Sequence, residues 1–483
     1  MSESSASAGL FYVRSGKGDA AVLINLSREI CYTDGVAVKT EVNMMYKQVS
    51  EELLSLIQQS PSCFHAVRTI SALLEEAGYT QLNECDSWKL EKGGKYYTTR
   101  NGSSVIAFAI GEELDDYHFQ LTSSHSDSPT FKVKERAELK GKGGYLQLNT
   151  EGYGGMLCAT WMDRPLSIAG RVLVREGNAL VSKLLSFDRD LVLIPNVAIH
   201  MNREVNNGLK YNNQVDMLPL FSAGECEEGD FRRLIAQELG CEENDIFGMD
   251  LYLVNRMAPS VWGAKEEFIS SPKLDDLQCA FTSLKAMLAG NNAHAVNVYA
   301  CFDNEEVGSG TKQGALSTFL SDVLSRISEN LGYSREDHFR AIAKSFMVSC
   351  DNAHAVHPNH PEKTDAENCT YLNKGVVIKF SANQKYTTDA ISSAVFSRIC
   401  EQAGVPVQHF ANRSDMAGGS TLGNLSSQQV SMHTVDIGLA QLAMHSSYET
   451  AGIKDTEYMI RALTRFYDCN LHITDSERIE VEE

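Results

Sequence analysis

The stretch CFDNEEVGSG, residues 301–310, places two carboxylates side by side directly after an apolar run. That run is VNVYACF, residues 296–302, and its length and content are typical of a buried strand. Glu305 and Glu306 repel each other unless a cation lies between them or one carboxylate is protonated. In open α/β sheets, ligands bind just beyond the carboxyl ends of strands. The stretch therefore predicts a strand of an α/β sheet that ends at a cation site.

The chain around this strand alternates between helical and strand-like segments. Apolar residues recur at helical spacing in some segments, and short β-branched or aromatic runs lie between them. The expected helices are 49–60, 60–79, 274–290, 318–331, 388–404 and 455–468, and the expected strands are 103–111, 117–124, 296–302, 345–350, 375–381 and 405–410. This order predicts a mixed α/β sheet that is covered by helices on both faces.

Residues 131–265 have a different pattern. Short apolar or alternating runs such as AGRVLVREG, residues 169–177, are separated there by Gly, Pro and Asp. We interpret this region as an inserted β-rich domain with its own small core. It divides the α/β domain into residues 45–130 and 266–483, as expected for a chain of 483 residues, which is long for a single core. Residues 1–44 are expected to form an N-terminal extension of uncertain order.

Composition excludes several classes of partner. The net charge of −20 disfavours nucleic acid and anionic membranes, because the mean field of the protein repels phosphate. No run of about 18 apolar residues is present, so no membrane span is expected. The twelve cysteines are scattered without a CxxC pair, and the N-terminus lacks the basic and apolar regions of a secretory signal. A cytoplasmic protein with reduced thiols is predicted.

Five points along the chain, most of them at the ends of expected strands, carry residues that can bind a metal ion. A lone histidine at such a point is more often a hydrogen-bonded loop residue, and a lone acid is often a helix cap, so no single position is decisive. The residues are His125 and Asp127, Asp275, Glu305 and Glu306, Asp351, and His445.

Together these residues match the number of ligands that a pair of metal ions requires. Two divalent ions about 3.5–4 Å apart require one bridging acid and two further ligands each, which two histidines and three carboxylates satisfy. Imidazole and carboxylate ligands without thiolate favour zinc, with manganese or cobalt as substitutes. Asp127 lies two residues after His125 and can accept the other N–H of its ring. One glutamate is left over and can act as general base.

Six motifs contain these residues or lie beside them. They are SSHSDSP (123–129), KLDDL (273–277), FDNEEVGS (302–309), DNAHAVHPN (351–359), NKGVVIK (373–379) and QLAMHSSYE (441–449). In this order they strongly resemble the aspartyl aminopeptidase family of dinuclear zinc exopeptidases, which also contains vacuolar aminopeptidase I. The resemblance covers residue 46 to about residue 470 and implies the core fold of those zinc exopeptidases.

The resemblance implies a role for each candidate. Asp275 is implied as the ligand that bridges two zinc ions, and Glu305 as the general base. The other implied ligands are His125 and Asp351 on one ion, and Glu306 and His445 on the other. The implied reaction is hydrolysis of the N-terminal peptide bond by a hydroxide held between the ions.

Members of the family act on short peptides and often prefer an N-terminal Asp or Glu. An acidic side chain needs a cation or hydrogen-bond donors in its pocket, and the matching positions here are His354, Lys379 and Tyr386. The plainer interpretation of Lys379 is a solvated residue at the end of a strand. Neutral or broad specificity is the alternative.

The inserted domain resembles the dimerisation domain of the family. The motif NVAIHMNRE, residues 196–204, matches one whose histidine enters the active site of the partner subunit and stabilises the oxyanion of the tetrahedral intermediate. This implies that His200 binds substrate in the partner. It also implies dimers that assemble into a tetrahedral dodecamer with an internal chamber.

Three other interpretations remain open on the sequence. A related dinuclear amidohydrolase, such as a deacylase or carboxypeptidase, would not require a free amine on its substrate. A non-catalytic assembly protein would have lost ligands or the base, whereas all five ligands and Glu305 are present. A mononuclear or structural site would hold one metal ion per chain instead of two.

Overall fold

The structure is a computed structural model that describes residues 35–475 and 477–482. Residues 1–34 of the extension predicted for residues 1–44 lie outside the described residues. Helix α1 (Gly35–Gln58) begins fourteen residues before the helical segment 49–60 that the sequence indicated, because no glycine or proline interrupts the chain after Gly35. The chain divides into two compact units, Met1–Met45 and Tyr46–Glu483, and every sheet found among the described residues belongs to the second.

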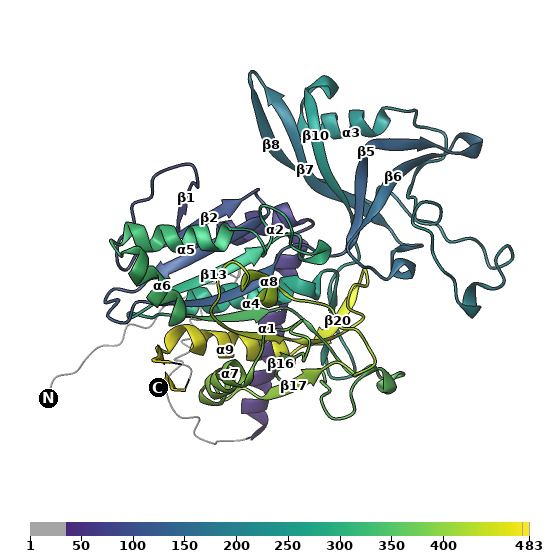
Figure 1. The fold of residues 1–483 in the computed structure, drawn as a ribbon. Coiled ribbons are helices and arrows are strands. Elements are labelled where there is room, and N and C mark those ends of the chain that lie inside the picture. The colour runs from purple at the N-terminus through teal and green to yellow at the C-terminus, as the bar shows by residue number, and fades with distance from the viewer. Residues whose placement is uncertain (1–34, 476, 483) are drawn as a thin grey trace. The chain divides into compact units, whose positions relative to one another are not determined.

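A nine-stranded mixed sheet forms the centre of the second unit (Figure 1). Its order is β1-β2-β3-β13-β4-β14-β18-β16-β17, and the adjacent strands β13, β4, β14 and β18 are parallel. The strands are β1 (Thr80–Leu82), β2 (Lys95–Arg100), β3 (Ser104–Ile110), β4 (Phe119–His125), β13 (Val296–Phe302), β14 (Phe346–Cys350), β16 (Val376–Phe380), β17 (Val407–Ala411) and β18 (His433–Gly438). The predicted mixed α/β sheet is confirmed.

Helices cover both faces of this sheet (Figure 1). Neighbouring residues of β4 point to opposite faces. Leu121 packs in the apolar core that includes α5 and α6, whereas the Thr122 hydroxyl contacts the Tyr467 hydroxyl of α9 at 2.6 Å on the other face. The helices are α2 (Cys63–Glu76), α4 (Leu274–Ala289), α5 (Phe319–Asn330), α6 (Arg335–Ala343), α7 (Ala390–Gln402), α8 (Leu422–Ser426) and α9 (Asp455–Asp468). None of the helices in the described part of the chain combines the length and apolarity that a bilayer crossing requires.

The inserted region forms a separate six-stranded sheet from residues 130–255. Its order is β8-β7-β10-β5-β6-β9, every pairing between its strands is antiparallel, and helix α3 (Asp230–Leu239) adds Phe231 and Ile235 to a core of its own. The strands are β5 (Thr130–Lys140), β6 (Leu146–Tyr153), β7 (Leu166–Glu176), β8 (Ala179–Ser186), β9 (Leu220–Ser222) and β10 (Ile246–Asn255). The domain limits at residues 131 and 265 stay a prediction.

Two smaller sheets complete the unit. One has five strands in the order β11-β12-β20-β19-β15, and the other pairs β21 with β22. The strands are β11 (Ser260–Trp262), β12 (Phe268–Ser271), β15 (Ala353–His354), β19 (Ala440–Leu442), β20 (Glu449–Gly452), β21 (Leu471–Ile473) and β22 (Ile479–Val481). Pairing of β12 with β20 sets Ser271 opposite Glu449 and so brings the 440s next to the start of α4.

The register of the central strands gathers the candidate residues at one edge of the large sheet. Phe302, the last residue of β13, pairs with His125, the last residue of β4. Ser349 of β14 pairs with Ser123 of β4. The loops that follow β4, β13 and β14 therefore leave the sheet side by side, at the edge where open α/β sheets bind ligands.

Candidate active site

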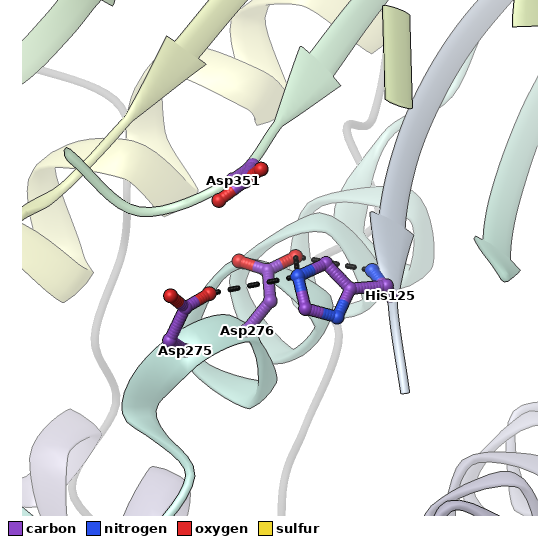
Figure 2. Close-up of side chains that lie close together, drawn as sticks. All are labelled: His125, Asp275, Asp276 and Asp351. Atoms are coloured by element: carbon purple, nitrogen blue, oxygen red, sulfur yellow. Dashed lines mark hydrogen bonds and ion pairs between the residues drawn. The ribbon is translucent and has the colours of Figure 1, made fainter. Parts of the chain in front are cut away.

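The predicted ligands converge around Asp275. Figure 2 shows His125 at the end of β4, Asp275 and Asp276 at the start of α4, and Asp351 directly after β14, with their side chains directed toward one another. The Nε2 atom of His125 lies 3.5 Å from Oδ1 of Asp275. His445 follows β19, and its Nε2 lies 3.5 Å from the other carboxylate oxygen of Asp275.

Two groups of potential ligand atoms share Asp275. One consists of His125, Asp275, Asp276 and Asp351, and the other of Asp275, Glu306 and His445; within each group the ligand atoms lie within 4.8 Å of one another. Nε2 of His445 is 3.4 Å from Oε2 of Glu306. These separations exceed an ordinary N–H···O hydrogen bond, but they match ligands held about 2.0–2.1 Å from a tetrahedral zinc ion.

The residues fit a bound cation in a second way. Oδ1 of Asp275, Oδ1 of Asp276 and Oε1 of Glu306 are buried and accept no hydrogen bond. A buried carboxylate oxygen without a partner is costly, and a metal ion removes that cost. The donor set of imidazole and carboxylate, without thiolate, is one that zinc accepts.

The electrostatics of the site are also consistent with bound cations. Burial, together with Asp351 and Asp127, raises the pKa of Glu305 to about 8. Burial and the Asp275 carboxylate hold the pKa of Glu306 well above its ordinary value. Burial opposes the charged form of His125, but the neighbouring aspartates outweigh it and raise the pKa of the ring. So many acids cannot all ionise in one buried site unless cations neutralise them.

Asp127 links the His125 loop to the glutamate loop. Its Oδ1 accepts the Glu305 amide at 3.1 Å, and its Oδ2 accepts the Glu306 amide at 3.2 Å. The Nδ1 atom of His125 lies 3.1 Å from the backbone carbonyl of Asp127 and 3.4 Å from its carboxylate. The main chain of Asp127 thus makes the closer contact with the imidazole, and its side chain mainly fixes the two glutamates.

Two buried acids at the site were not identified from the sequence as functional residues. Glu449 accepts the Asp275 amide at 2.9 Å and the His445 amide at 2.7 Å, so one carboxylate holds the main chain of two candidate ligands. Asp276 accepts the amide of His125 at 3.0 Å. Asp276 lies in the motif KLDDL and Glu449 in QLAMHSSYE, so the signal in the sequence was an acidic residue within four positions of a candidate ligand.

Of the three residues predicted for the substrate pocket, Lys379 lies beside Asp351. Lys379 is 1% exposed, and its Nζ donates to the carbonyls of Asp351 at 2.7 Å and Asn352 at 3.3 Å. The same ammonium lies 3.9 Å from the Asp351 carboxylate and 5.1 Å from the centre of the Tyr386 ring. His354 is exposed on β15, and its ring is 6.1 Å from that of Phe410.

His200 is not part of this cluster within one chain. It is exposed in the inserted region, in the connection between β8 and β9, and belongs to none of the groups of potential metal ligands found among the described residues. The sequence expectation for His200 concerns a partner subunit, so its position in one chain leaves that expectation a prediction.

Comparisons with known proteins agree with this geometry. The M18 family, described as aminopeptidase I zinc metalloprotease, matches residues 56–467. A Clostridium novyi protein named probable M18 family aminopeptidase 2 is 46% identical over 425 residues, which cover 87% of this chain and 98% of that protein. A chain in the cryo-EM structure of the Ape4 and Nbr1 complex matches with a TM-score of 0.84 at 35% identity, and the match covers 88% of this chain and 86% of that chain. The crystal structure of yeast aminopeptidase 1 matches with a TM-score of 0.77 at 26% identity, and the match covers 87% of this chain and 97% of the yeast chain. The chain therefore belongs to the M18 family of zinc metalloproteases and is a metal-dependent aminopeptidase.

Proposed function

We propose that this aminopeptidase holds two zinc ions per subunit and removes N-terminal Asp or Glu from short peptides. The observation that carries the two-ion proposal is the position of Asp275, whose two carboxylate oxygens face different histidines. A carboxylate placed in this way can bridge two ions. A mononuclear site would leave one of the two groups of ligands without a metal.

Each proposed ligand has a place in this arrangement. His125 and Asp351 hold one ion, Glu306 and His445 hold the other, and Asp275 holds both. Manganese or cobalt can substitute for zinc in such a donor set. Bound zinc supplies Lewis acidity, which polarises a carbonyl and makes water easier to deprotonate.

Glu305 is the proposed general base. Its carboxylate lies in a group with His125 and Glu306 and is not needed in either group that shares Asp275. Asp127 fixes the Glu305 amide and so limits where the side chain can reach. A carboxylate held at the edge of the ligand cluster can accept a proton from the attacking water and return it to the leaving amine.

Elemental analysis and a substrate comparison test this proposal. We expect two zinc ions per chain, and hydrolysis of peptides and anilides that have a free α-amine, but not of N-acyl amino acids. One ion per chain would contradict the two-ion site. Hydrolysis of N-acyl substrates at a similar rate would assign the chain to the deacylases instead.

A preference for acidic residues is proposed from the charge beside Asp351. In this proposal the Lys379 ammonium attracts the side-chain carboxylate of an N-terminal Asp or Glu. Replacing Lys379 by methionine removes that attraction, so we expect kcat/KM for Asp- and Glu-anilides to fall about 10- to 100-fold relative to Leu-anilide. Lys385→Met, at an exposed lysine in the following loop, is the matched control. Equal losses on Asp-, Glu-, Leu- and Lys-anilides would mean that Lys379 only holds Asp351 and that specificity is neutral or broad.

Self-association is proposed from the connection between β8 and β9. Val197, Ile199, Met201 and Val215 are 47–82% exposed there, as in a surface that a second copy covers. A solved structure of yeast mApe1, with a TM-score of 0.77, is a dodecamer. We propose dimers in which His200 enters the partner's site, and a tetrahedral dodecamer built from them.

Mixing two inactive variants tests whether His200 acts in the partner. His200→Ala and Glu305→Gln are each expected to be nearly inactive when expressed alone. When they are co-expressed, a mixed dimer contains one site with both groups intact, so roughly a quarter of wild-type activity should return. The control is co-expression of Glu305→Gln with Asp275→Asn, which share one site. Absence of recovery in the first mixture would contradict action in the partner.

A cytoplasmic location is proposed from the thiols. The cysteines in the described part of the chain are all free, and several, such as Cys279 and Cys350, are buried. Free thiols of this kind are typical of a reducing compartment.

A further inference from the structure

The end of β6 and the loop after it bring the inserted sheet into contact with the metal-ligand loops. We call residues 153–160 the support segment. Its Leu157 amide donates to the carbonyl of His445 at 3.0 Å. The Thr160 hydroxyl accepts the Ser447 amide at 2.9 Å. The segment therefore binds the main chain on both sides of Ser446, in the loop that presents His445.

The imidazole of His445 is also held by this segment. Its Nδ1 lies 2.6 Å from the carbonyl oxygen of Gly155. A carbonyl can only accept, so Nδ1 must carry a proton, and in the neutral ring the lone pair of Nε2 faces Asp275 and Glu306. His445 itself has a φ of 65°, an uncommon conformation for a residue with a side chain, so the loop depends on its contacts.

Tyr153 reaches the other half of the site. Its hydroxyl donates to Oδ2 of Asp127 at 2.7 Å and accepts from the side-chain amide of Asn304 at 2.8 Å. Asp127 in turn holds the amides of Glu305 and Glu306. The hydroxyl is thus linked through a single residue, Asp127, to the proposed base and to one proposed ligand, although β6 belongs to the inserted sheet.

The backbone of the segment passes very close to the glutamate loop. Gly154 has a φ of +76°, and a Cβ atom at this position would lie 3.1 Å from Cβ of Glu306 and 3.3 Å from its carbonyl oxygen. Only glycine combines this conformation with so close an approach. The approach brings the Gly155 carbonyl within reach of His445.

From these contacts we infer that the inserted sheet supplies positioning groups for the metal site, namely the hydroxyl of Tyr153 and the carbonyl of Gly155. The first orients the glutamate loop through Asp127, and the second fixes the tautomer and direction of His445. This inference rests on the two-ion site proposed above. Groups that orient metal ligands in this way typically account for about 10- to 100-fold in metal affinity or activity.

Two variants with matched controls test the inference by zinc binding. Tyr153→Phe removes one hydroxyl, and its control is Tyr252→Phe, which removes the hydroxyl of the ring that packs edge-on against Tyr153 at 5.5 Å. Gly154→Ala is compared with Gly177→Ala, which has a φ of +63° in the β7–β8 turn but no neighbouring atom within 4 Å of the added methyl. Zinc dissociation constants are measured by competition with a chromophoric chelator. Thermal unfolding is recorded with and without excess chelator.

We expect each test variant to lose about 10-fold or more in affinity for at least one zinc ion, while both controls bind zinc like the wild type. The increase in melting temperature that zinc confers should shrink in the test variants only. A lower melting temperature in the presence of chelator, with unchanged zinc affinity, would overturn the inference. If Gly154→Ala does not fold, Tyr153→Phe decides the question alone. Wild-type protein that binds only one ion would instead refute the two-ion proposal.

Discussion

Glu305→Gln is expected to lower kcat by about 10²- to 10⁴-fold while two zinc ions stay bound. Glutamine has the shape of glutamate but cannot accept a proton from water, so the proposed proton transfer is lost and the ligand cluster is not. KM should change little, because Glu305 is not a proposed contact of the ground-state peptide. Steady-state kinetics and elemental analysis on the same preparation measure both quantities.

The neighbouring residue provides the control for this variant. Glu306→Gln removes a proposed ligand that lies 3.4 Å from His445, so zinc content should fall together with activity. Loss of zinc in Glu305→Gln as well would make Glu305 a ligand. Wild-type turnover in Glu305→Gln would eliminate it as the base.

Asp275→Asn is expected to abolish both activity and tight binding of both ions. An amide can offer one neutral oxygen, whereas the proposed bridge needs two anionic oxygens, one toward each histidine. We expect fewer than one zinc ion per chain after dialysis and activity below about 10⁻⁴ of the wild type. Elemental analysis and an anilide assay measure these two quantities.

Asp455→Asn is the matched control. Asp455 is another buried aspartate at the start of a helix, where its carboxylate accepts the amides of Asn373 and Gly375. The same loss of charge there should lower stability but leave zinc content at the wild-type value. Retention of two ions in Asp275→Asn would contradict a bridging role and with it the arrangement proposed for the whole site.

The residues of the central sheet and of the proposed site could be identified from local patterns. VNVYACF ends where the structure ends β13, and the polar residues after β4, β13 and β14 lie together because parallel neighbours end at one edge. The side-chain period of a strand and the spacing of a helix are properties of a few consecutive residues. For that reason the strand ends, and the acids and histidines beyond them, could be identified before any coordinates were known.

The residues that hold the candidate ligands in place could be identified only from the tertiary structure. Glu449 holds Asp275 because β20 pairs with β12, and Tyr153 reaches Asp127 from a different sheet. Lys379 is buried beside Tyr386 instead of solvated, because the carbonyls of Asp351 and Asn352, in the loop after β14, accept hydrogen bonds from its ammonium.

The sequence by itself therefore determined the carboxyl ends of the six predicted strands of the central sheet to within one residue and the chemistry of the candidate ligands, because each depends on a short run of residues. Only the tertiary structure decided which groups orient those ligands and which charges are buried. Those properties depend on hydrogen bonds and packing between segments more than a hundred residues apart, such as Tyr153 with Asn304 and Gly155 with His445, and no local pattern records such contacts.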